Sequence, residues 1–369
     1  MLTRWPIWAE IAVVTRVGSR HNGLSGRYYT DPDVFAHELD HIFARTWQLV
    51  GHVSQVASPG QVFTAPVGDE SVLVVNHDGA VRGFYNVCQH RGHRLVASDF
   101  AELSAITCPY HAWTYDLGGR LITARGENVG ELCVPPVRLD TMAGFLFANL
   151  DPDAIPLEET VPGIESELLA IAPDAGQRVL SSRRTQLINA NWKIAVENYN
   201  ECYHCPNVHK SFTTNTVNPG SYRITLRGST IHHTAQGPPP KPSGSFGHGE
   251  VGEYGAFYTW PVSSIQCYPG RELNTFRWVP LAVDQTMLIR EWWLDRADLT
   301  AEQREVIELD WTTTVVEDLS IMESVQKGAA SRGYRPGPLI VNPSGVADVH
   351  SENTVAHLQR LLLDALDGP

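Results

Sequence analysis

Two short loops, each with one cysteine and one histidine, constrain this chain more than any other feature of its sequence. They contain Cys88-x-His90 and Cys108-x-x-His111, and hairpin-forming β segments separate them. Thiolates and imidazoles bind zinc or iron, so the ligand set alone does not choose the metal. Their order does, because a zinc finger usually groups its two cysteines and its two histidines. One of each per loop is typical of a [2Fe-2S] centre in which thiolates hold one iron and imidazoles the other.

This order resembles that of a Rieske centre, and the alternatives are a zinc site or four core residues that bind no metal. Respiratory-chain Rieske proteins carry additional cysteines in both loops, which form a disulfide. The matching positions here are His93 and Tyr110, so we expect loops without a cross-link. Tyr110 is a candidate for a hydroxyl that contacts a cluster sulfur, with simple loop packing as the alternative.

Length and charge limit what the chain can be. Its 369 residues predict two domains, and the formal charge of -13 argues against a nucleic-acid partner, which needs a basic face. No apolar stretch approaches the roughly 18 residues that a membrane span needs. The six cysteines are too scattered for a disulfide scaffold, which fits a reducing compartment. We therefore expect a cytoplasmic protein without nucleic-acid or membrane partners.

The pattern of apolar residues divides the chain into three parts. Residues 1–45 are expected to be an N-terminal helical segment that packs on the catalytic domain. Residues 46–152 contain short β runs with hairpin signals at Asp78-Gly79 and Gly118-Gly119, which predict a small antiparallel β domain. Residues 153–369 mix helices with long strands, which predicts a domain with an antiparallel sheet. The fold class is therefore α+β.

A second group of ligand residues lies in the later part of the chain. Glu201 and His204 are three residues apart, on one face of a helix that we expect Pro206 to end. His209 is about 140° further round an unbroken helix than His204, so one metal can bind both only if the helix breaks. Two histidines and one carboxylate are the ligands of a non-haem Fe(II) site that activates O2. Local spacing nominates Glu201 as the carboxylate, and Glu197 lies on the same stripe.

A late helix offers another carboxylate. A capping box at Thr300 and Gln303 predicts its start, and we expect it to run to about Gly328. Asp318 lies in an otherwise apolar stripe, and an unpaired buried carboxylate needs a cation. Glu317 lies on the polar side and is expected to be solvated. The stripe consists of Trp311, Val315, Asp318, Met322 and Val325.

Cys202-x-x-Cys205 lies in the same segment as the histidines. A redox-active pair normally lies at a helix N-terminus, where the dipole lowers the pKa of the thiol. Here the pair lies at the far end of a helix that we expect to run to Cys205. Two buried thiols are therefore expected, with a redox pair as the alternative.

With these motifs together, the chain resembles the α-subunits of Rieske non-haem iron oxygenases over nearly its full length. In that family the iron ligands match His204, His209 and Asp318. The acid that matches Glu201 bridges an iron histidine to a Rieske histidine of the neighbouring subunit, here His111. Most relatives have Asp there, and Glu201 resembles the branch that acts on carnitine, glycine betaine and related quaternary ammonium compounds. The resemblance rests on the two loops and on the segments "NWKIAVENYNECYHCPNVH", "EDLSIME" and "SENTVAHLQRLL".

The resemblance also implies the cofactors and partners. They are a Rieske [2Fe-2S] cluster, Fe(II), O2 and a small-molecule substrate, in a head-to-tail homotrimer whose catalytic domain has a helix-grip sheet. Electrons from NAD(P)H would come through a separate flavin- or ferredoxin-type reductase, because this chain has no G-x-G-x-x-G loop or further cysteine cluster.

The substrate is the least constrained part of the prediction. Aromatic faces recognise trimethylammonium groups, and Tyr258, Trp260, Phe276 and Trp278 alternate on expected strands, although sheet core is the alternative. A Pro/Gly-rich loop at residues 237–250 is a candidate lid. Our first hypothesis is a monooxygenase or N-demethylase of a small quaternary ammonium or N-methyl compound. Hydroxylation of an aromatic ring or carboxylate is the second, and a non-catalytic electron-transfer protein is the third.

Overall fold

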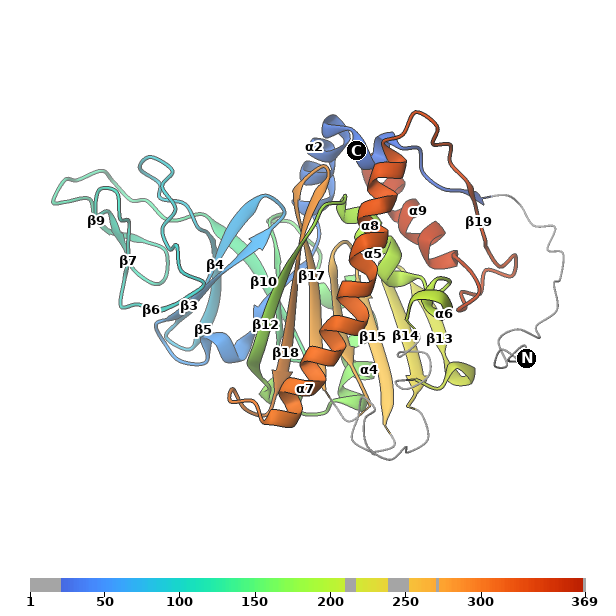
Figure 1. Ribbon diagram of the computed structural model, residues 1–369. Helices are drawn as coiled ribbons and strands as arrows, with labels where there is room; N and C mark the ends of the chain where they lie inside the picture. Colours follow the sequence, from blue (N-terminus) through green and yellow to red (C-terminus); the bar gives the residue numbers. More distant parts are fainter. Residues whose placement is uncertain (1–20, 210–216, 238–251, 270–271, 368–369) are drawn as a thin grey trace, which may run out of the picture.

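The computed structural model of the chain describes residues 21–209, 217–237, 252–269 and 272–367. Two lobes form the molecule, each built on a seven-stranded antiparallel sheet (Figure 1). This confirms the predicted α+β class. Apart from Gly237, the loop that we considered as a lid lies outside the described residues.

The smaller lobe contains the loops with the paired cysteines and histidines. Its main sheet has the order β2-β11-β10-β5-β4-β3-β6, and β7-β8-β9 form a small sheet at its tip. The hairpins predicted at Asp78-Gly79 and Gly118-Gly119 are confirmed, since they connect β4 to β5 and β8 to β9. The strands are β2 (Gln48–His52), β3 (Gln61–Val67), β4 (Glu70–His77), β5 (Ala80–Tyr85), β6 (Phe100–Glu102), β7 (Ile106–Thr107), β8 (Thr114–Tyr115), β9 (Leu121–Thr123), β10 (Pro136–Met142) and β11 (Phe145–Asn149).

The larger lobe is built on the second sheet, in the order β12-β18-β17-β16-β15-β14-β13. Residues 257–268 belong to two antiparallel strands joined by a turn at Trp260-Pro261, so Tyr258 and Trp260 do not alternate on one strand as expected. The strands of the larger lobe's sheet are β12 (Val179–Ile188), β13 (Arg223–Arg227), β14 (Thr230–Gln236), β15 (Glu253–Thr259), β16 (Ser263–Cys267), β17 (Leu273–Ala282) and β18 (Gln285–Leu294). A short pair, β1 (His21–Asn22) and β19 (Pro338–Leu339), lies apart from it.

Helices α5, α8 and α9 cover one face of this second sheet (Figure 1). None of the helices in the described parts of the chain is long and apolar enough to cross a membrane. The α-helices are α1 (Arg27–Thr30), α2 (Pro32–Glu38), α3 (Leu157–Thr160), α4 (Ile164–Ile171), α5 (Trp192–Asn200), α6 (Cys205–Val208), α7 (Ala301–Asp310), α8 (Val316–Ala329) and α9 (Asn353–Asp367).

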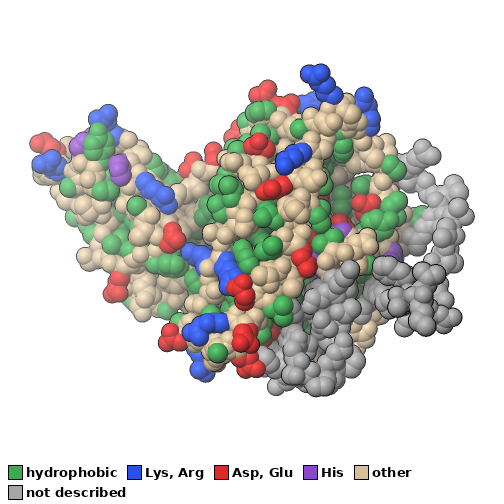
Figure 2. All heavy atoms as spheres, viewed as in Figure 1, with side chains coloured by type: hydrophobic (Ala, Val, Ile, Leu, Met, Phe, Trp, Pro, Cys, Tyr) green, Lys and Arg blue, Asp and Glu red, His purple; other side chains and the backbone are tan. Residues whose placement is uncertain are grey.

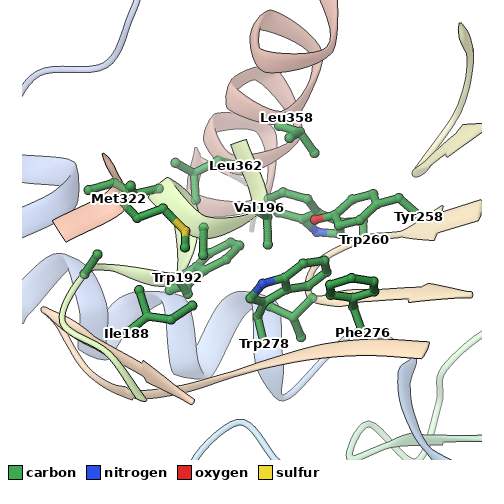
Figure 3. Close-up of a cluster of buried hydrophobic side chains, with 14 of the residues drawn as sticks. Ile188, Trp192, Val196, Tyr258, Trp260, Phe276, Trp278, Met322, Leu358 and Leu362 are labelled. Atoms are coloured by element: carbon green, nitrogen blue, oxygen red, sulfur yellow. The ribbon is translucent and has the colours of Figure 1, made fainter. Parts of the chain in front are cut away.

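An aromatic core fixes α5 against the sheet. Trp192 of α5 packs against Trp260, and Trp278 of β17 lies beside them with Leu358 and Leu362 of α9 (Figure 3). A second core joins the lobes, because aromatic residues of β11 and of β15 and β18 share one buried cluster. The sheets of the two lobes are therefore packed together at this cluster.

The end of α5 differs from the sequence-based prediction. The helix stops at Asn200, and Glu201 is extended, with φ -109° and ψ 141°. A separate short helix, α6, begins at Cys205 with Pro206 in its first turn, where a missing N–H has no helical partner to lose. The prediction that the helix runs to Cys205 and that Pro206 ends it is wrong.

The late helix starts as predicted but is not regular. Thr300 and Gln303 form the capping box, with each side chain accepting from the other's backbone N–H. A π-helical turn at Trp311–Val315 separates α7 from α8 and shifts the face that follows it. The predicted apolar stripe holds at Val315 and Met322, which are buried, and fails at Val325, which is 49% exposed, while Gln326 is buried.

Candidate metal centres

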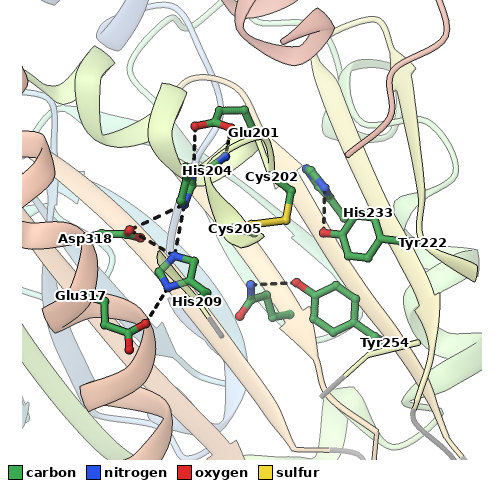
Figure 4. Close-up of a disulfide and its surroundings, with 11 residues drawn as sticks. Glu201, Cys202, His204, Cys205, His209, Tyr222, His233, Tyr254, Glu317 and Asp318 are labelled. Carbon is green, nitrogen blue, oxygen red and sulfur yellow. Dashed lines mark hydrogen bonds and ion pairs between the residues drawn. A yellow bond between two sulfur atoms is a disulfide. The ribbon is translucent and has the colours of Figure 1, made fainter. Parts of the chain in front are cut away.

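Three side chains from α8 and from the segment around α6 converge on one point (Figure 4). The Nε2 atoms of His204 and His209 are 3.2 Å apart. Asp318 Oδ1 lies 3.1 Å from His209 Nε2 and 3.6 Å from His204 Nε2. Ligand atoms about 2.1 Å from a metal and at right angles to each other would be about 3.0 Å apart. The spacing therefore fits a single ion held on one face by two histidines and a carboxylate.

Each histidine also contacts a further carboxylate at Nδ1, the ring nitrogen that lies away from the shared point. Glu201 Oε1 lies 2.6 Å from His204 Nδ1, and its Oε2 accepts a hydrogen bond from the His204 backbone N–H at 3.1 Å. Glu317 Oε2 lies 2.8 Å from His209 Nδ1. A neutral imidazole that donates from Nδ1 presents a lone pair at Nε2. Both rings are therefore held in the tautomer that a metal at the shared point requires.

The charges around His209 favour a positive group. Burial lowers the pKa of this histidine, but the hydrogen bonds and charges of Asp318 and Glu317 outweigh burial and raise the pKa to about 9. Carboxylates that stabilise a proton on the ring would equally stabilise a cation bound at Nε2.

Two of the acids do not behave as the sequence suggested. Glu317 was expected to be solvated, which is wrong, since it is 34% exposed and contacts His209. Glu197 does not reach the histidines. It accepts hydrogen bonds from the Tyr29 hydroxyl and from Gln359 Nε2, and burial raises its pKa to about 7. Helix α5 therefore turns Glu197 toward the N-terminal segment and α9.

The two loops in the small lobe have the same backbone form. Cys88 donates its N–H to the carbonyl five residues later and accepts from the N–H of Gly92. Cys108 and Ala112 repeat this arrangement. Gly92 and Ala112 both have positive φ, at 68° and 58°, which an alanine adopts at a cost.

The cysteines and histidines of these loops differ in burial. Cys88 and Cys108 are 2% exposed, whereas His90 is exposed and His111 half-buried. The two imidazole centroids are 4.7 Å apart, and Trp113 stacks on His90. The His111 Nδ1 atom has no hydrogen-bond partner among the described residues. Thiols inside and imidazoles outside fit a cluster with one buried iron and one near the surface, at the lobe tip on the left of Figure 2.

The hydroxyl near the cluster comes from a residue that the sequence did not single out. Tyr110, the candidate, is 52% exposed, and its ring lies against His111. Tyr115 places its hydroxyl 3.3 Å from Cys88 Sγ and accepts from the Gln89 N–H, which leaves its hydrogen for the sulfur. The position of Tyr115 directly after the loop could have identified it, because a tyrosine that is buried there needs a hydrogen-bond partner for its hydroxyl.

Comparisons with known proteins agree with this geometry. Residues 46–135 match the family model "Rieske [2Fe-2S] domain", and residues 173–368 match "Ring hydroxylating alpha subunit (catalytic domain)". The carnitine monooxygenase oxygenase subunit of Escherichia coli K12 is 36% identical over 349 residues, which are 92% of each chain. This chain belongs to the Rieske ring-hydroxylating oxygenase α-subunits. The prediction of a Rieske oxygenase with a [2Fe-2S] cluster and mononuclear iron is confirmed at the level of the family.

Other relatives of this oxygenase subunit point in the same direction. The glycine betaine monooxygenase oxygenase subunit of Chromohalobacter salexigens is 27% identical, over 84% of this chain and 80% of the relative. A solved quaternary ammonium Rieske monooxygenase in complex with its substrate L-carnitine has a TM-score of 0.83 and 31% identity, over 94% of this chain and 96% of its own. Naphthalene 1,2-dioxygenase, at 19% identity and a TM-score of 0.78, shares the fold.

In the oxygenase subunit, a cavity of about 100 Å³ adjoins the histidine–aspartate group. Phe276 and Trp278, two of the predicted pocket residues, line this cavity. Tyr258 and Trp260 are not among its lining residues. The Tyr258 hydroxyl donates to the Pro261 carbonyl, and Trp260 packs in the core. Four tyrosines that the sequence-based prediction missed also line the cavity: Tyr199, Tyr222, Tyr254 and Tyr268.

Cys202 and Cys205 form a disulfide that also lines the cavity (Figure 4). The expectation of two buried thiols is therefore wrong, although both residues are buried. The pair lies beside His204, with Cys202 in the turn after α5 and Cys205 as the first residue of α6. Residue spacing alone does not locate this turn, because its position depends on where α5 ends.

Proposed function

We propose that this oxygenase subunit performs monooxygenation at a carbon bound to the nitrogen of a small quaternary ammonium or N-methyl compound. Such an oxidation releases an amine and an aldehyde, as in oxidative N-demethylation. The observation that carries the proposal is the convergence of two Nε2 atoms and one carboxylate oxygen beside an aromatic cavity. The similarity to carnitine and glycine betaine monooxygenase subunits supports the substrate class.

His204, His209 and Asp318 are the proposed ligands of Fe(II). Iron held by two histidines and one carboxylate keeps open positions and supplies O2 activation. The chain's own contribution is to fix these ligands, through Glu201 on one ring and Glu317 on the other. Asp318 adds the negative charge that favours a divalent ion.

The proposed cluster ligands are Cys88, His90, Cys108 and His111. Matching backbone hydrogen bonds give the two loops the same form, and the centroids of the two imidazoles lie 4.7 Å apart, which supports this assignment. Tyr115 would donate to one cluster thiolate and so tune its reduction potential.

A cationic substrate suits the walls of the cavity. Aromatic faces attract quaternary ammonium groups, and Tyr199, Phe276 and Trp278 pack together on one side of it. None of the described residues that line the cavity is a lysine or arginine, so no fixed positive side chain repels such a substrate. Glu201 and Asp318 lie on the side of the proposed iron site.

The partners are part of the same proposal. Electrons from NAD(P)H would arrive through a separate flavin- or ferredoxin-type reductase, in the cytoplasm. A head-to-tail homotrimer is proposed because the cluster loops and the histidine–aspartate group lie in different lobes (Figure 1). The buried, unpartnered Nδ1 of His111 would bind the cluster iron, and Nε2 of the same ring would then meet Glu201 of the neighbouring subunit, which would bridge the two metal centres.

The first experiment tests the iron ligand and the reaction together. Asp318→Ala should lose the mononuclear iron and the oxygenation while the cluster spectrum stays intact, because the cluster lies in the other lobe. Full iron occupancy in this variant would instead indicate Glu201 or Glu317 as the third ligand. With a surrogate reductase, wild-type protein should oxidise betaines and not benzoates, and the opposite preference would refute the proposed substrate class.

The second experiment separates a ligand from a bridge at Glu201. As a ligand, Glu201→Gln would replace an anionic oxygen by a weak neutral one, and iron should be lost. As a bridge, the variant should keep iron and cluster, accept electrons at the cluster, and fail in single-turnover reoxidation by O2 and substrate. Normal reoxidation would rule out the bridge.

A further inference from the structure

The cavity wall contains a buried histidine that the proposed metal sites do not use. His233 of β14 is 3% exposed, and its Nε2 atom has no hydrogen-bond partner among the described residues. The preceding residue on the strand, His232, faces the other way and contacts Glu167. Buried polar groups in native proteins almost always have a partner, so an unpaired one in a cavity points to a ligand.

A chain of hydrogen bonds sets the proton of His233. The Gln266 amide nitrogen can only donate, and it donates to the Tyr254 hydroxyl at 3.3 Å. The Tyr254 hydroxyl is hydrogen-bonded to that of Tyr222, which lies 3.2 Å from His233 Nδ1. Because Tyr254 accepts from Gln266, its own hydroxyl hydrogen is donated to Tyr222, and the Tyr222 hydroxyl in turn donates to His233 Nδ1. A neutral imidazole that accepts at Nδ1 carries its hydrogen on Nε2.

The imidazole is neutral at physiological pH. Burial, and then the neighbouring His232, lower the pKa of His233 to about 3. Its Nε2–H is therefore an uncharged donor on a residue of the cavity wall, and the described residues supply no acceptor for it.

The two ends of the cavity are separate. In Figure 4 the His233–Tyr222 pair and the His204–His209 pair lie on opposite sides of the Cys202–Cys205 disulfide. All of these residues line the same cavity. A ligand that fills it can place one group toward the carboxylates of the iron site and another at His233.

We propose that the His233 Nε2–H binds a carboxylate oxygen of the substrate and so turns the quaternary nitrogen toward the iron site. This inference rests on the proposed function and narrows it to ammonium acids, in preference to ammonium alcohols or simple alkylammonium ions. A neutral donor suits such a zwitterion, since a lysine or arginine in its place would repel the cationic end as it attracted the carboxylate. His233 is thus a positioning and specificity residue and takes no part in the chemistry itself.

The test compares two probes that differ in the carboxylate alone. One is 4-(trimethylammonio)butyrate and the other is butyltrimethylammonium, each supplied to the reconstituted holoenzyme with a surrogate reductase. We expect wild-type enzyme to prefer the acid. His233→Leu should raise KM for the acid about 10- to 100-fold, the range of one hydrogen bond to a charged group. Its kcat/KM for butyltrimethylammonium should stay as in the wild type.

Three further variants separate positioning from a general structural role. His233→Gln restores an N–H donor and should recover part of the preference for the acid. Tyr222→Phe removes the donor to Nδ1, so it should weaken the preference without deleting the imidazole. His232→Leu is the matched control, because it deletes an equally buried histidine of the same strand that does not line the cavity. It should leave the ratio between the two probes unchanged.

The outcomes distinguish this inference from the proposed function. If wild-type enzyme oxidises neither quaternary compound, the proposed function is wrong, and this inference falls with it. If it oxidises both without preference, or if folded His233→Leu keeps the preference, only the inference is wrong. An equal loss on both probes in His233→Leu would indicate a structural role and would also overturn it. Should His233→Leu not fold, a preference unchanged in Tyr222→Phe is the refuting result.

Discussion

Removing the carboxylate of Glu317 should weaken iron binding at a residue that does not touch the metal. Its Oε2 lies 2.8 Å from His209 Nδ1, on the side of the ring away from the proposed iron. Loss of such an outer partner typically costs 10- to 100-fold in metal affinity, or about 1.4 to 2.7 kcal/mol. Because the side chain is 34% exposed, solvent screens part of this effect. We expect a loss near the lower limit, about tenfold, for Glu317→Ala.

The measurement is an anaerobic titration of iron-depleted protein with Fe(II) against a competing chelator. Glu317→Gln keeps an acceptor oxygen and loses the charge, so its affinity should fall between those of Glu317→Ala and wild type. Glu305→Ala is the control, since it removes an exposed carboxylate from α7. The cluster spectrum serves as an internal standard for intact protein in every sample.

One result would refute the reasoning. If Glu317→Ala binds Fe(II) as tightly as wild type, then the bond at Nδ1 does not orient or polarise His209 for a metal. Alanine is a better helix former than glutamate, so a general loss of α8 stability is not expected to mimic the effect.

Four further predictions concern other parts of the molecule. Tyr115→Phe should lower the reduction potential of the cluster in a redox titration, because a hydrogen bond to a ligand sulfur stabilises the reduced state. Ala112→Gly should raise the free energy of unfolding of the small lobe, by up to about 1 kcal/mol in thermal unfolding, because φ is 58° there. Burial raises the pKa of Glu197 from 4.5 to about 7, so the folded state binds a proton that the unfolded state releases, and stability should fall as pH rises through this window; Glu197→Gln should flatten that profile in denaturant titrations. Protein denatured without a reductant and freed of iron should show four reactive thiols, rising by two after reduction, because Cys202 and Cys205 are bonded and the other cysteines are free.

The ligand sets were predictable because their information is local. Each loop of the cluster site holds its cysteine and histidine within four residues, and the order of ligands distinguishes iron–sulfur from zinc. His204, His209 and Asp318 followed from residue type and from the resemblance to the oxygenase family, and the structure brings the three together.

The outer partners were not predictable, because they depend on packing between distant segments. Glu317 lies next to Asp318 in sequence, yet whether it faces solvent or His209 depends on how α8 is rotated over the sheet. A π-helical turn at Trp311–Val315 also precedes α8, and a pattern interpreted as one regular helix does not include it. Tyr115 and His233 were missed for a related reason, since their partners come from other strands or loops.

Two departures from regular helix lie close to proposed iron ligands: the end of α5 before His204, and the π-helical turn before Asp318. In an unbroken helix, Glu201 would lie beside His204 on one face and compete with Asp318 for the metal. The extended backbone at Glu201 instead directs its carboxylate to Nδ1 of that histidine, on the side away from the metal point. On the other side, Glu317 and Asp318 are consecutive residues of α8 and therefore point about 100° apart, toward different atoms of His209. Asp318 faces the metal point and Glu317 the Nδ1 of His209. Rules of helical spacing therefore fail here for a reason: a metal ligand and its outer carboxylate must approach one imidazole from opposite sides.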